Sequence, residues 1–563
     1  MAIIGIDLGT TNSLVSFFKE GEPTLIPNPL GEYLTPSVIS YDPETKEIFV
    51  GKIAKERLIT HPGSTINLFK RGMGTAKKYT LANKEFTAEE LSSLIIKRLK
   101  EDAESFLGCE IEEAIISVPA YFSEPSRRAT KIAGELADLN VERIVNEPTA
   151  AALAYGFHEK EDYSKFLIFD LGGGTFDISI LEKYGSVMEV RAVAGDVFLG
   201  GEDFTEILLK MFAKEVDLKL SELSEKNRAI LFKAIEKAKC EFVNSHNVGI
   251  KVNVDEKDYE AEINLKDYTV KCEDLLSRIR HSIKIAISDS SLSLDDIDNI
   301  ILVGGATKLP VIKNFVSKLF SRFPSANINP DEVVALGCAV HAALKERDQT
   351  IQEMVLTDVC PFTLGTSGAR KQENGLVVSD IYVPIIERNT IIPISRVERF
   401  YTLDDNQSQI YFKILQGESH RASENTLLGE LSLSIPKAKG GEECADIRFT
   451  YDINGILEAE VTVISTGFKK SLIIENNPGI FTEQEILEKI EALSLLKIHP
   501  REKEEYRLLL SRGERLYQES LGDTREFIGR ELLAFEQALN SQITRKINDA
   551  TKKFKEILED MDN

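Results

Sequence analysis

The stretch GIDLGTTNS at residues 5–13 has a close echo in DLGGGTFD at residues 170–177. In each copy an apolar run ends in an Asp, and glycines that allow a tight turn and close backbone approach follow it. The hydroxyl side chains in the two copies, which can contact phosphate or metal-bound water, are Thr10, Thr11, Ser13 and Thr175. Each copy therefore predicts a phosphate-binding hairpin.

Two such hairpins in one chain indicate a two-lobed nucleotide cleft whose half-sites face each other across a triphosphate. Asp7, Asp170 and Asp177 would then orient a hydrated magnesium ion. One such motif alone is as typical of an ordinary β-turn, but a second copy, with ILVGGATKLP at residues 301–310, favours the nucleotide site. The sequence has no G-x-x-x-x-G-K-[ST] stretch, which argues against a P-loop.

Length and composition indicate a soluble, multidomain chain. The 563 residues, 42% of them hydrophobic, suffice for several cores and suggest about three or four domains. The 68 Lys and Arg against 91 Asp and Glu give a net charge of -23, which disfavours nucleic acid and membrane surfaces as partners. No stretch is typical of a signal peptide or a membrane span. The six cysteines lack C-x-x-C spacing, which favours reduced thiols and a cytoplasmic location.

Residues 1–345 alternate short β-branched runs with longer helical patterns, as expected of α/β layers. FLIFDLGG at 166–173 and NIILVGGA at 299–306 predict buried strands that run into glycine turns. Residues 88–107 predict an amphipathic core helix. Its apolar face comprises Leu91, Leu94, Ile95, Leu99, Ala103 and Phe106.

A linker is expected at residues 346–358, where a polar run gives way to a short apolar one, and an antiparallel β domain at 359–480. QIYFKILQ at 409–416 alternates, which places Ile410, Phe412 and Ile414 on one face. ADIRFTYDINGILEAEVTV at 445–463 contains an Asn-Gly turn between two alternating runs, a strong hairpin signal.

Residues 481–563 predict a helical tail. Thr482 and Glu485 form a capping-box pattern, flanked by Phe481 and Ile486 as a hydrophobic staple, so a helix is expected to begin at Thr482. A second pattern of Asp523 with Glu526 precedes an apolar stripe. The stripe comprises Ile528, Leu532, Phe535, Leu539, Ile543 and Ile547. A small bundle is expected, with a free coiled-coil arm as the alternative.

The order of several stretches resembles the seventy-kilodalton heat-shock (DnaK-like) chaperones: GIDLGTTNS, VPAYFSEPSRRAT, NEPTAAALAYG, DLGGGTFD, GDVFLGGEDF, LVGGATKLP and NPDEVVALG. The resemblance continues through IIERNTIIP, DDNQSQ, LQGE and DINGILE, so it spans nearly the whole chain. The short tail and trimmed first-domain segments look most like the bacterial HscC branch. The resemblance implies an actin-like α/β two-lobed ATPase domain, an antiparallel β-sandwich that holds extended apolar peptides, and an α-helical lid.

The resemblance also implies roles for individual positions. The catalytic residues it implies are Lys70, Glu147, Asp177 and Thr175, with Asp7 and Asp170 around the metal through water. Phosphate and adenosine contacts fall on Thr10, Thr11, Asn12, Gly172, Gly173, Gly174, Gly200, Gly201, Glu236, Lys239, Gly304, Gly305, Lys308 and Asp331. Pro119 and Arg127 match the positions that couple ATP state to the peptide domain. The implied peptide-binding residues are Phe400, Leu403, Ile410 and Phe412.

Four positions depart from the family pattern. Lys308 replaces an arginine that usually stacks on adenine, and Cys240 replaces a second one in some members, so nucleotide binding weaker by about tenfold per lost stack at most is expected. Thr366 and Leu403 change the lining of the peptide site, which predicts a narrower or shifted client range. Without the resemblance, Lys70 would be interpreted as a surface lysine.

The implied function is an ATP-dependent chaperone, in which ATP hydrolysis gates the binding and release of extended apolar segments of unfolded proteins. ATP/ADP and Mg²⁺ are the expected cofactors, and K⁺ is left open. A J-domain co-chaperone is an expected partner, whereas the need for an exchange factor is left open. The alternative is a weakly hydrolysing exchange-factor-like or scaffold relative. A sugar kinase of the same fold would leave the β domain unexplained, and a filament-forming actin relative would end near residue 345.

Overall fold

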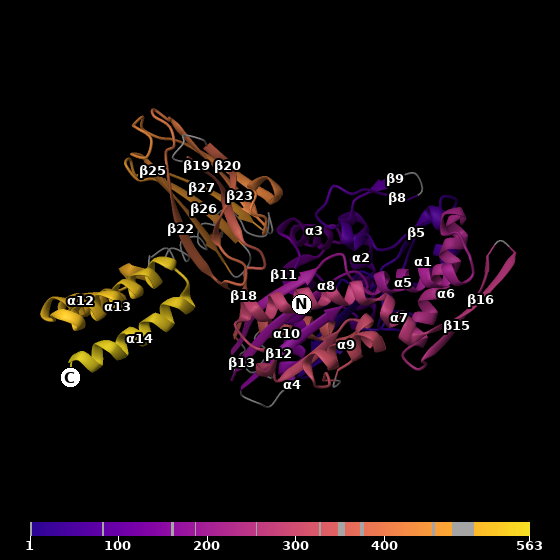
Figure 1. The fold of residues 1–563 in the computed structure, drawn as a ribbon. Helices are drawn as coiled ribbons and strands as arrows, with labels where there is room; N and C mark the ends of the chain where they lie inside the picture. Colours follow the sequence, from indigo (N-terminus) through magenta and orange to yellow (C-terminus); the bar gives the residue numbers. More distant parts are fainter. Residues whose placement is uncertain are drawn as a thin grey trace. The chain divides into compact units, whose positions relative to one another are not determined.

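A computed structural model describes residues 3–81, 84–158, 163–185, 187–254, 256–325, 328–346, 355–371, 377–452, 456–475 and 500–562. These residues fall into two compact units (Figure 1). Unit 1 contains the described residues up to Leu364 together with 387–392. Unit 2 contains 365–386, 393–474 and the described residues from 500 onward.

Unit 1 is built around two mixed sheets of similar plan. The lobe I sheet has the order β11-β10-β1-β2-β3, with strands Asn140–Asn146, Glu113–Val118, Ile3–Asp7, Asn12–Lys19 and Glu22–Leu25. The lobe II sheet has the order β17-β12-β13-β14-β18-β21, with strands Asn299–Val303, Tyr163–Leu171, Phe176–Tyr184, Val187–Asp196, Val355–Val359 and Ile391–Ile392.

Each sheet contains an antiparallel three-stranded meander, and the first strand of that meander pairs in parallel with a strand from further along the chain. These parallel pairs are β1 with β10 and β12 with β17. The two Asp-Leu-Gly motifs occupy equivalent places, because each lies between the first and second strands of its meander. The motif therefore occurs twice because the sheet plan occurs twice.

Helices α4 (Glu147–His158) and α10 (Val333–Glu346) pack against each other, and their buried side chains share a core with strands of both sheets. Their approach is close. A Cβ built at Gly337 of α10 would lie 1.8 Å from the carbonyl oxygen of Ala150 in α4. Only glycine fits at this crossing, which holds the two lobes together at their base.

His341 on α10 predicts a pH dependence of stability. It is buried, its Nδ1 has no hydrogen-bond partner among the described residues, and burial together with the charge of Arg143 lowers its pKa to about 3. In the unfolded chain it titrates near 6.5. As pH falls below about 6.5, the unfolded state therefore binds a proton at this histidine that the folded state does not, so the contribution of His341 to the stability of unit 1 should fall by about 1.4 kcal/mol per pH unit. The raised pKa values of buried carboxylates in unit 1 act in the opposite direction, so the histidine is measured as a difference between variants.

Denaturant unfolding at pH 7.5 and pH 5 measures this dependence. Compared with wild type, His341→Gln should be relatively more stable at pH 5 than at pH 7.5, whereas replacement of the exposed His281 on α8 (Glu273–Ser290) by Gln should leave the change between the two pH values as it is in wild type. The same change in wild type and His341→Gln would contradict the assignment.

Helices cover the two sheets of unit 1. The helix expected over 88–107 is confirmed as α2 (Ala88–Leu107), with Leu91, Ile95 and Leu99 buried. Phe106 is instead 51% exposed, because it lies near the end of the helix, where its ring meets only the edge of Phe17. The other helices are α1 (Lys52–Thr60), α3 (Glu124–Glu135), α5 (Gly201–Glu215), α6 (Glu225–Glu241), α7 (Leu265–Lys271) and α9 (Pro310–Phe320). Smaller strands are β4 (Thr35–Pro36), β5 (Ile39–Tyr41), β6 (Ile48–Val50), β7 (Thr65–Ile66), β8 (Tyr79–Leu81), β9 (Lys84–Phe86), β15 (Asn247–Val254) and β16 (Lys257–Asn264).

Strand β18 lies in the stretch expected to be a linker. It runs parallel to β14, with Glu189 opposite Thr357, and β21 pairs with it on the other side. The lobe II sheet thus continues beyond the expected boundary at residue 345. The division into residues 1–345, 346–358, 359–480 and 481–563 stays a prediction.

The strands of unit 2 form two four-stranded sheets that face each other, since a Cβ at Gly429 would lie 2.6 Å from Leu472 of the other sheet. The burial of Ile410, Phe412 and Ile414 confirms the expected alternation. The expected hairpin is confirmed by the antiparallel pairing of β25 and β26, although its turn, residues 453–455, lies outside the described residues. One sheet contains β20 (Val377–Ile386), β19 (Leu364–Lys371), β23 (Gln409–Gln416) and β24 (Thr426–Ser434). The other contains β22 (Ile394–Tyr401), β25 (Cys444–Tyr451), β26 (Ile456–Val463) and β27 (Lys469–Glu475).

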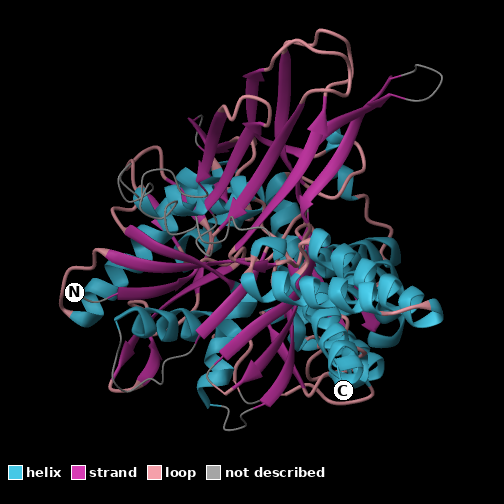
Figure 2. Cartoon of the chain, turned by 90° about the vertical axis from the view of Figure 1, so that its left-hand side faces the viewer, coloured by secondary structure: helices cyan, strands magenta, loops and turns pink. Residues whose placement is uncertain are grey.

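The chain ends in a bundle of α12 (Glu504–Glu519), α13 (Gly522–Ser541) and α14 (Thr544–Asp562), seen as adjacent helices near the C-terminus in Figure 2. The bundle is confirmed, and a free coiled-coil arm is excluded for these helices, because they share one apolar core. The pattern at Thr482 lies outside the described residues.

Two details of the expected tail were wrong. Helix α13 begins at Gly522, so Asp523 lies inside its first turn, where a carboxylate favours the helix dipole, rather than at its cap. The apolar stripe also spans two helices, because the chain turns at Gln542 (φ 55°) and Ile547 lies on α14. In the part of the chain that the structure describes, no helix combines the length and the apolar character that a membrane span requires.

Candidate active site

The two predicted phosphate hairpins lie face to face. A Cβ built at Gly173 would approach the side chain of Thr11 to 2.3 Å, and one at Gly174 would approach that of Thr10 to 2.7 Å. At Gly200 a Cβ would lie 2.4 Å from the backbone nitrogen of Gly174. The hairpins therefore pack together only because these positions lack side chains, and the hydroxyls of one lie against the backbone of the other.

Four carboxylates and one lysine gather beside the hairpins. Lys70, in the short helix Phe69–Gly72, is 4% exposed, and its Nζ donates to Glu147 Oε1 at 2.9 Å. Asp7 accepts a hydrogen bond from Ser117 Oγ at 3.0 Å, and Asp177 accepts one from the backbone N–H of Tyr121 at 3.0 Å. Asp170 and Thr175 are buried at the two ends of the Gly172–Gly174 turn.

The carboxylates repel one another because they are buried with little compensating charge. Burial and the charge of Glu147 raise the pKa of both Asp7 and Asp177 to about 7. Burial, Glu147, Asp177 and Asp7 raise the pKa of Asp170 well above its usual value, and Lys70 opposes all three shifts. Such a surplus of negative charge suits a divalent cation.

The described residues contain no group of three or more His, Cys, Asp or Glu side chains placed to bind a metal ion directly. Asp7 and Asp170 instead fit a hydrated ion, which they would hold through its water molecules.

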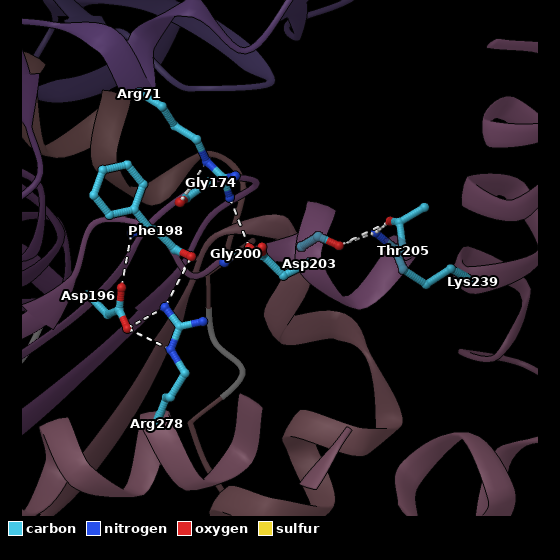
Figure 3. Close-up of polar contacts among 10 residues, drawn as sticks. Arg71, Gly174, Asp196, Phe198, Gly200, Asp203, Thr205, Lys239 and Arg278 are labelled. Atoms are coloured by element: carbon cyan, nitrogen blue, oxygen red, sulfur yellow. Dashed lines mark hydrogen bonds and ion pairs between the residues drawn. The ribbon is translucent and has the colours of Figure 1, made fainter. Parts of the chain in front are cut away.

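Arg71, next to Lys70, links lobe I to the loop before α5 (Figure 3). Its Nε donates to the carbonyl oxygen of Gly174 at 3.1 Å, and its second terminal nitrogen donates to Asp203 Oδ2 at 2.9 Å. Asp203 also accepts from the N–H of Gly200 at 2.8 Å. Sequence reasoning missed Arg71 and Asp203, although each is close in sequence to a predicted site residue.

The same loop is fixed on its other side by Arg278 of α8 (Figure 3). Arg278 donates two hydrogen bonds, at 2.6 and 2.9 Å, to Asp196 Oδ2 and one at 3.2 Å to the carbonyl oxygen of Phe198. The N–H of Phe198 donates to Asp196 Oδ1 at 3.0 Å. The approach to Gly200 is therefore held from both lobe I and lobe II.

The predicted adenosine residues form two groups of contacts. In the first, Lys239 Nζ donates to Thr205 Oγ1 at 2.7 Å and to the carbonyl oxygen of Gly201 at 3.0 Å (Figure 3). The same ammonium lies 2.7 Å from Glu236 Oε2, and Thr205 also donates to Glu236. Thr205, which no motif indicated, therefore joins Glu236 and Lys239 to the start of α5.

In the second group, Lys308 Nζ donates to Asp331 Oδ2 at 2.5 Å. Gly305 is required here because its Cβ would lie 2.8 Å from Asp331 Oδ1, and Gly304 adopts φ 82° against the end of β12. The two groups approach each other at Gly201, where an added Cβ would lie 3.2 Å from Ala306 and 3.6 Å from Lys239 Nζ. Lys308 is thus neutralised by a carboxylate at the position where the family pattern has a stacking arginine.

An ion pair bridges the two lobes away from the hairpins. Lys233 Nζ of α6 lies 2.8 Å from Glu56 Oε2 of α1, and both side chains are more than half exposed. Exposed pairs contribute about 0.2–1 kcal/mol, so Lys233→Ala should speed nucleotide release by about 1.5- to 5-fold. Stopped-flow release of a fluorescent ADP analogue measures this rate.

The ion-pair prediction has an internal control. Lys237→Ala removes a lysine that pairs within α6, with Glu241 at 3.9 Å, and should leave the release rate unchanged. An effect of Lys233→Ala that persists in high salt would contradict an exposed electrostatic origin.

Arg127, one of the two predicted coupling residues, lies on a hydrogen-bonded path to β18. Arg127 donates to the carbonyl oxygen of Ala120 at 3.0 Å, in the loop after Pro119, and to Asn146 Oδ1 at 2.5 Å. Asn146 Nδ2 donates to Asp358 Oδ2 at 2.7 Å. Sequence reasoning missed Asn146 and Asp358, although Asn146 directly precedes the catalytic candidate Glu147.

The segment 387–392 is also anchored on lobe II. Arg388 Nε donates to Asp289 Oδ2 at 2.8 Å, and Asn389 Nδ2 donates to the same carboxylate oxygen at 2.8 Å. The N–H of Val193 donates to Asn389 Oδ1 at 2.8 Å. Residues beyond the expected linker thus belong to the ATPase-like unit.

In unit 2, the predicted peptide-site residues Phe400 and Phe412 meet edge to face, with ring centroids 5.3 Å apart. Ile410 is buried two residues before Phe412. Leu403 lies in the following loop, where its N–H donates to Gln407 Oε1 at 3.0 Å, and it is not brought to the aromatic pair by any described contact. Thr366 is fully buried, and its hydroxyl has no partner in the described part of the chain.

Two facing phosphate hairpins with a buried lysine among carboxylates define a two-lobed phosphate-binding unit, here joined to a β domain and a helical bundle. The sequence profile described as Hsp70 protein matches residues 3–81 and 76–562. The chaperone protein DnaK of Ureaplasma urealyticum is 39% identical over 497 residues, covering 86% of this chain and 80% of that protein. DnaK of Ureaplasma parvum is 38% identical over 86% of this chain and 79% of its own.

The chain therefore belongs to the Hsp70 family. This membership confirms the expectation of an ATP-dependent chaperone, and the exchange-factor-like or scaffold alternative is not favoured. Members of the family are ATPases that use ATP and ADP with Mg²⁺.

Proposed function

We propose that this chain is an ATP-gated clamp for extended apolar peptides, with an actin-like ATPase unit that controls a peptide-binding β-sandwich and a helical lid. The path from Arg127 through Asn146 to Asp358 carries the proposal. Asn146 is bonded at both ends and adjoins Glu147, so a change at the nucleotide site has a direct connection to β18, the strand that leads toward the β domain.

For hydrolysis, we assign the positive charge at the transferring phosphate to Lys70, which Glu147 positions at 2.9 Å. A cation beside the developing charge stabilises the transition state, and this is typically the largest single contribution to phosphoryl transfer. Asp177 and Thr175 orient the attacking water. A bound magnesium ion would supply further positive charge to the phosphate oxygens, and Asp7 and Asp170 would hold its water molecules.

For nucleotide binding, we assign the phosphates to Thr10, Thr11, Asn12 and the Gly172–Gly174 turn, with Gly200 and Gly201 beside them. The close contacts between the two hairpins support this assignment. The adenosine is assigned to the Glu236–Lys239 group and to the Gly304–Lys308 segment with Asp331, both of which approach Gly201 at the start of α5. The pairing of Lys308 with Asp331 supports nucleotide binding weaker than in relatives with an arginine there.

For peptide binding, we assign the pocket to Phe400, Leu403, Ile410 and Phe412. The aromatic contact between β22 and β23 supports this site, because it lies between the two facing sheets. Unfolded or extended polypeptides are the proposed clients. A fully buried apolar side chain gains roughly 1.5–3 kcal/mol, so one anchor residue suffices to select among clients.

Several finer features stay predictions from the resemblance: K⁺ as a second cation, a J-domain co-chaperone and the need for an exchange factor. A place in the HscC branch is supported by the short β8–β9 hairpin, which fills most of the chain between the Lys70 segment and α2. A cytoplasmic location is supported by six free cysteines.

The test is the release rate of a labelled extended apolar peptide after mixing the purified protein with ATP or ADP. Much faster release with ATP is expected, because peptide affinity and nucleotide state are linked. A shift from mostly closed to mostly open requires the two nucleotides to differ by about 5.5 kcal/mol in their preference. Equal rates with the two nucleotides would overturn the clamp and favour a scaffold.

A further inference from the structure

Ser37, which follows the short strand β4, is bonded to the first phosphate hairpin at three points. Its Oγ donates to the carbonyl oxygen of Gly9 at 2.8 Å and lies 2.9 Å from Ser13 Oγ. Its backbone N–H donates to the carbonyl oxygen of Thr11 at 2.9 Å. Ser37 is 3% exposed, so these hydrogen bonds are shielded from solvent.

The direction of each hydrogen bond follows from the number of protons available. The single hydroxyl proton of Ser37 is directed to Gly9, so the proton of Ser13 is the one shared between the two hydroxyls. Ser13 Oγ in turn accepts from the N–H of Gly9 at 3.1 Å. The backbone N–H and C=O of Gly9 are thus both satisfied by the two serines. The hairpin is tight here, since a Cβ at Gly9 would lie 1.9 Å from the Asn12 carbonyl oxygen.

The second hairpin satisfies its carbonyl oxygens by a different route. The oxygens of Gly172 and Gly173 accept hydrogen bonds from the N–H groups of Gly201 and Glu202, at 2.9 and 3.0 Å, at the start of α5. Among the described residues of lobe I, no helix begins at the first hairpin, and Ser37 makes the equivalent contacts with Gly9 and Thr11. In both hairpins a neighbouring segment therefore binds the carbonyl oxygens, which would otherwise repel a phosphate.

We propose that Ser37 is a positioning residue of the phosphate site: it binds the carbonyl oxygens of the first hairpin, so that the hairpin presents its donors to a polyphosphate. The proposal rests on the nucleotide-binding function proposed above. Ser37 acts through Gly9, Ser13 and Thr11 and does not touch the nucleotide. Its loss should weaken the binding of ligands that carry phosphates and spare the binding of adenosine.

Titration calorimetry of the full chain with ADP and with adenosine, both with Mg²⁺, tests this assignment. Ser37→Ala should weaken ADP binding about tenfold, change adenosine binding less than twofold, and raise the KM for ATP more than it lowers kcat. Ser37→Thr, which keeps the hydroxyl, should restore ADP binding. Ser40→Ala is the matched control, since Ser40 is equally buried and bonds to Ser64, Thr65 and Arg57 instead of the hairpin.

The proposal would be overturned if Ser37→Ala weakened the binding of ADP and of adenosine equally, or if it left ADP binding unchanged. A loss of ADP binding in Ser40→Ala equal to that in Ser37→Ala would also overturn it. If Ser37→Ala does not fold, Ser37→Cys fills the same space with a weak hydrogen-bonding group and should give the same selective loss. A wild-type protein that binds neither ADP nor ATP would overturn the proposed function itself. That result differs from a Ser37 variant that binds ADP as tightly as wild type does, which would overturn only the role of Ser37.

Discussion

Replacing Lys70 with alanine should abolish ATP turnover and leave ATP binding in place. Removing one preorganised electrostatic donor typically costs 10²- to 10³-fold in kcat, so hydrolysis should fall by at least about 100-fold. Binding persists because the hairpin hydroxyls and backbone groups are untouched. Lys70 is also the ammonium that opposes the raised pKa values of all three aspartates, Asp7, Asp170 and Asp177. Single-turnover hydrolysis and equilibrium binding of ATP measure the two effects separately.

Lys78→Ala is the control for this variant. Lys78 lies eight residues later, is 62% exposed, and pairs with Glu85 across the β8–β9 hairpin. The Lys78→Ala variant should hydrolyse ATP at the wild-type rate. If Lys70→Ala kept a turnover rate within tenfold of wild type, the catalytic role of Lys70 would be contradicted. Lys70 would then be only the buried ion-pair partner of Glu147.

Replacing Arg127 with alanine should make peptide release insensitive to ATP. The variant loses hydrogen bonds to Ala120, Phe122 and Asn146 together, and Asn146 is the only described link between that loop and Asp358 of β18. A hydrogen bond to a charged group contributes about 1.5–3 kcal/mol, so the loss of the path should lower the ATP-induced acceleration by at least about tenfold. Stopped-flow release of a labelled peptide measures it.

A nucleotide-binding assay on the Arg127 variant distinguishes a loss of coupling from a loss of ATP binding. Arg128→Ala, at the exposed neighbouring position, should keep the full ATP response. If Arg127→Ala released peptide as fast with ATP as wild type does, the path through Asn146 would not carry the signal, and the contacts of Arg388 with Asp289 would be the next candidate.

Local chemistry made much of the fold predictable. The Asp-Leu-Gly repeats, the buried runs before them and the helix at 88–107 depend on residues close in sequence, and each forms as expected. The strand order depends on contacts between distant segments, and no pattern in β18 indicated that it would pair with β14, since the two lie more than 150 residues apart. The start of α13 was missed for a smaller reason, because Gly522 can enter the helix where Asp523 is the better cap.

Some residues of the candidate site could be predicted from the sequence motifs, and others only from the family resemblance. Asp7, Asp170, Asp177 and the threonines follow from the motif chemistry alone. Lys70 and Glu147 depended on the family resemblance, because their ion pair joins positions 77 residues apart, and each alone is typical of a surface or helix-start residue.

The residues that were missed share a cause. Thr205, Ser37 and Asn146 are neutral, and their roles come from partners that folding brings to them. The Asn146 bond to Asp358 spans 212 residues, so no local pattern marks it.

Strand β18 also covers an edge of the lobe II sheet. An outer strand of a sheet presents unpaired N–H and C=O groups to any extended chain that meets it, and such edges are common starting points for aggregation. Here β18 covers the free side of β14 between Val187 and Glu189. Without β18, that stretch would be an open sheet edge, at which an extended segment of a second copy could pair in its place. Because β18 is tethered to the same chain, its effective concentration favours its own return. Strand β18 thus protects the edge of the sheet to which it belongs.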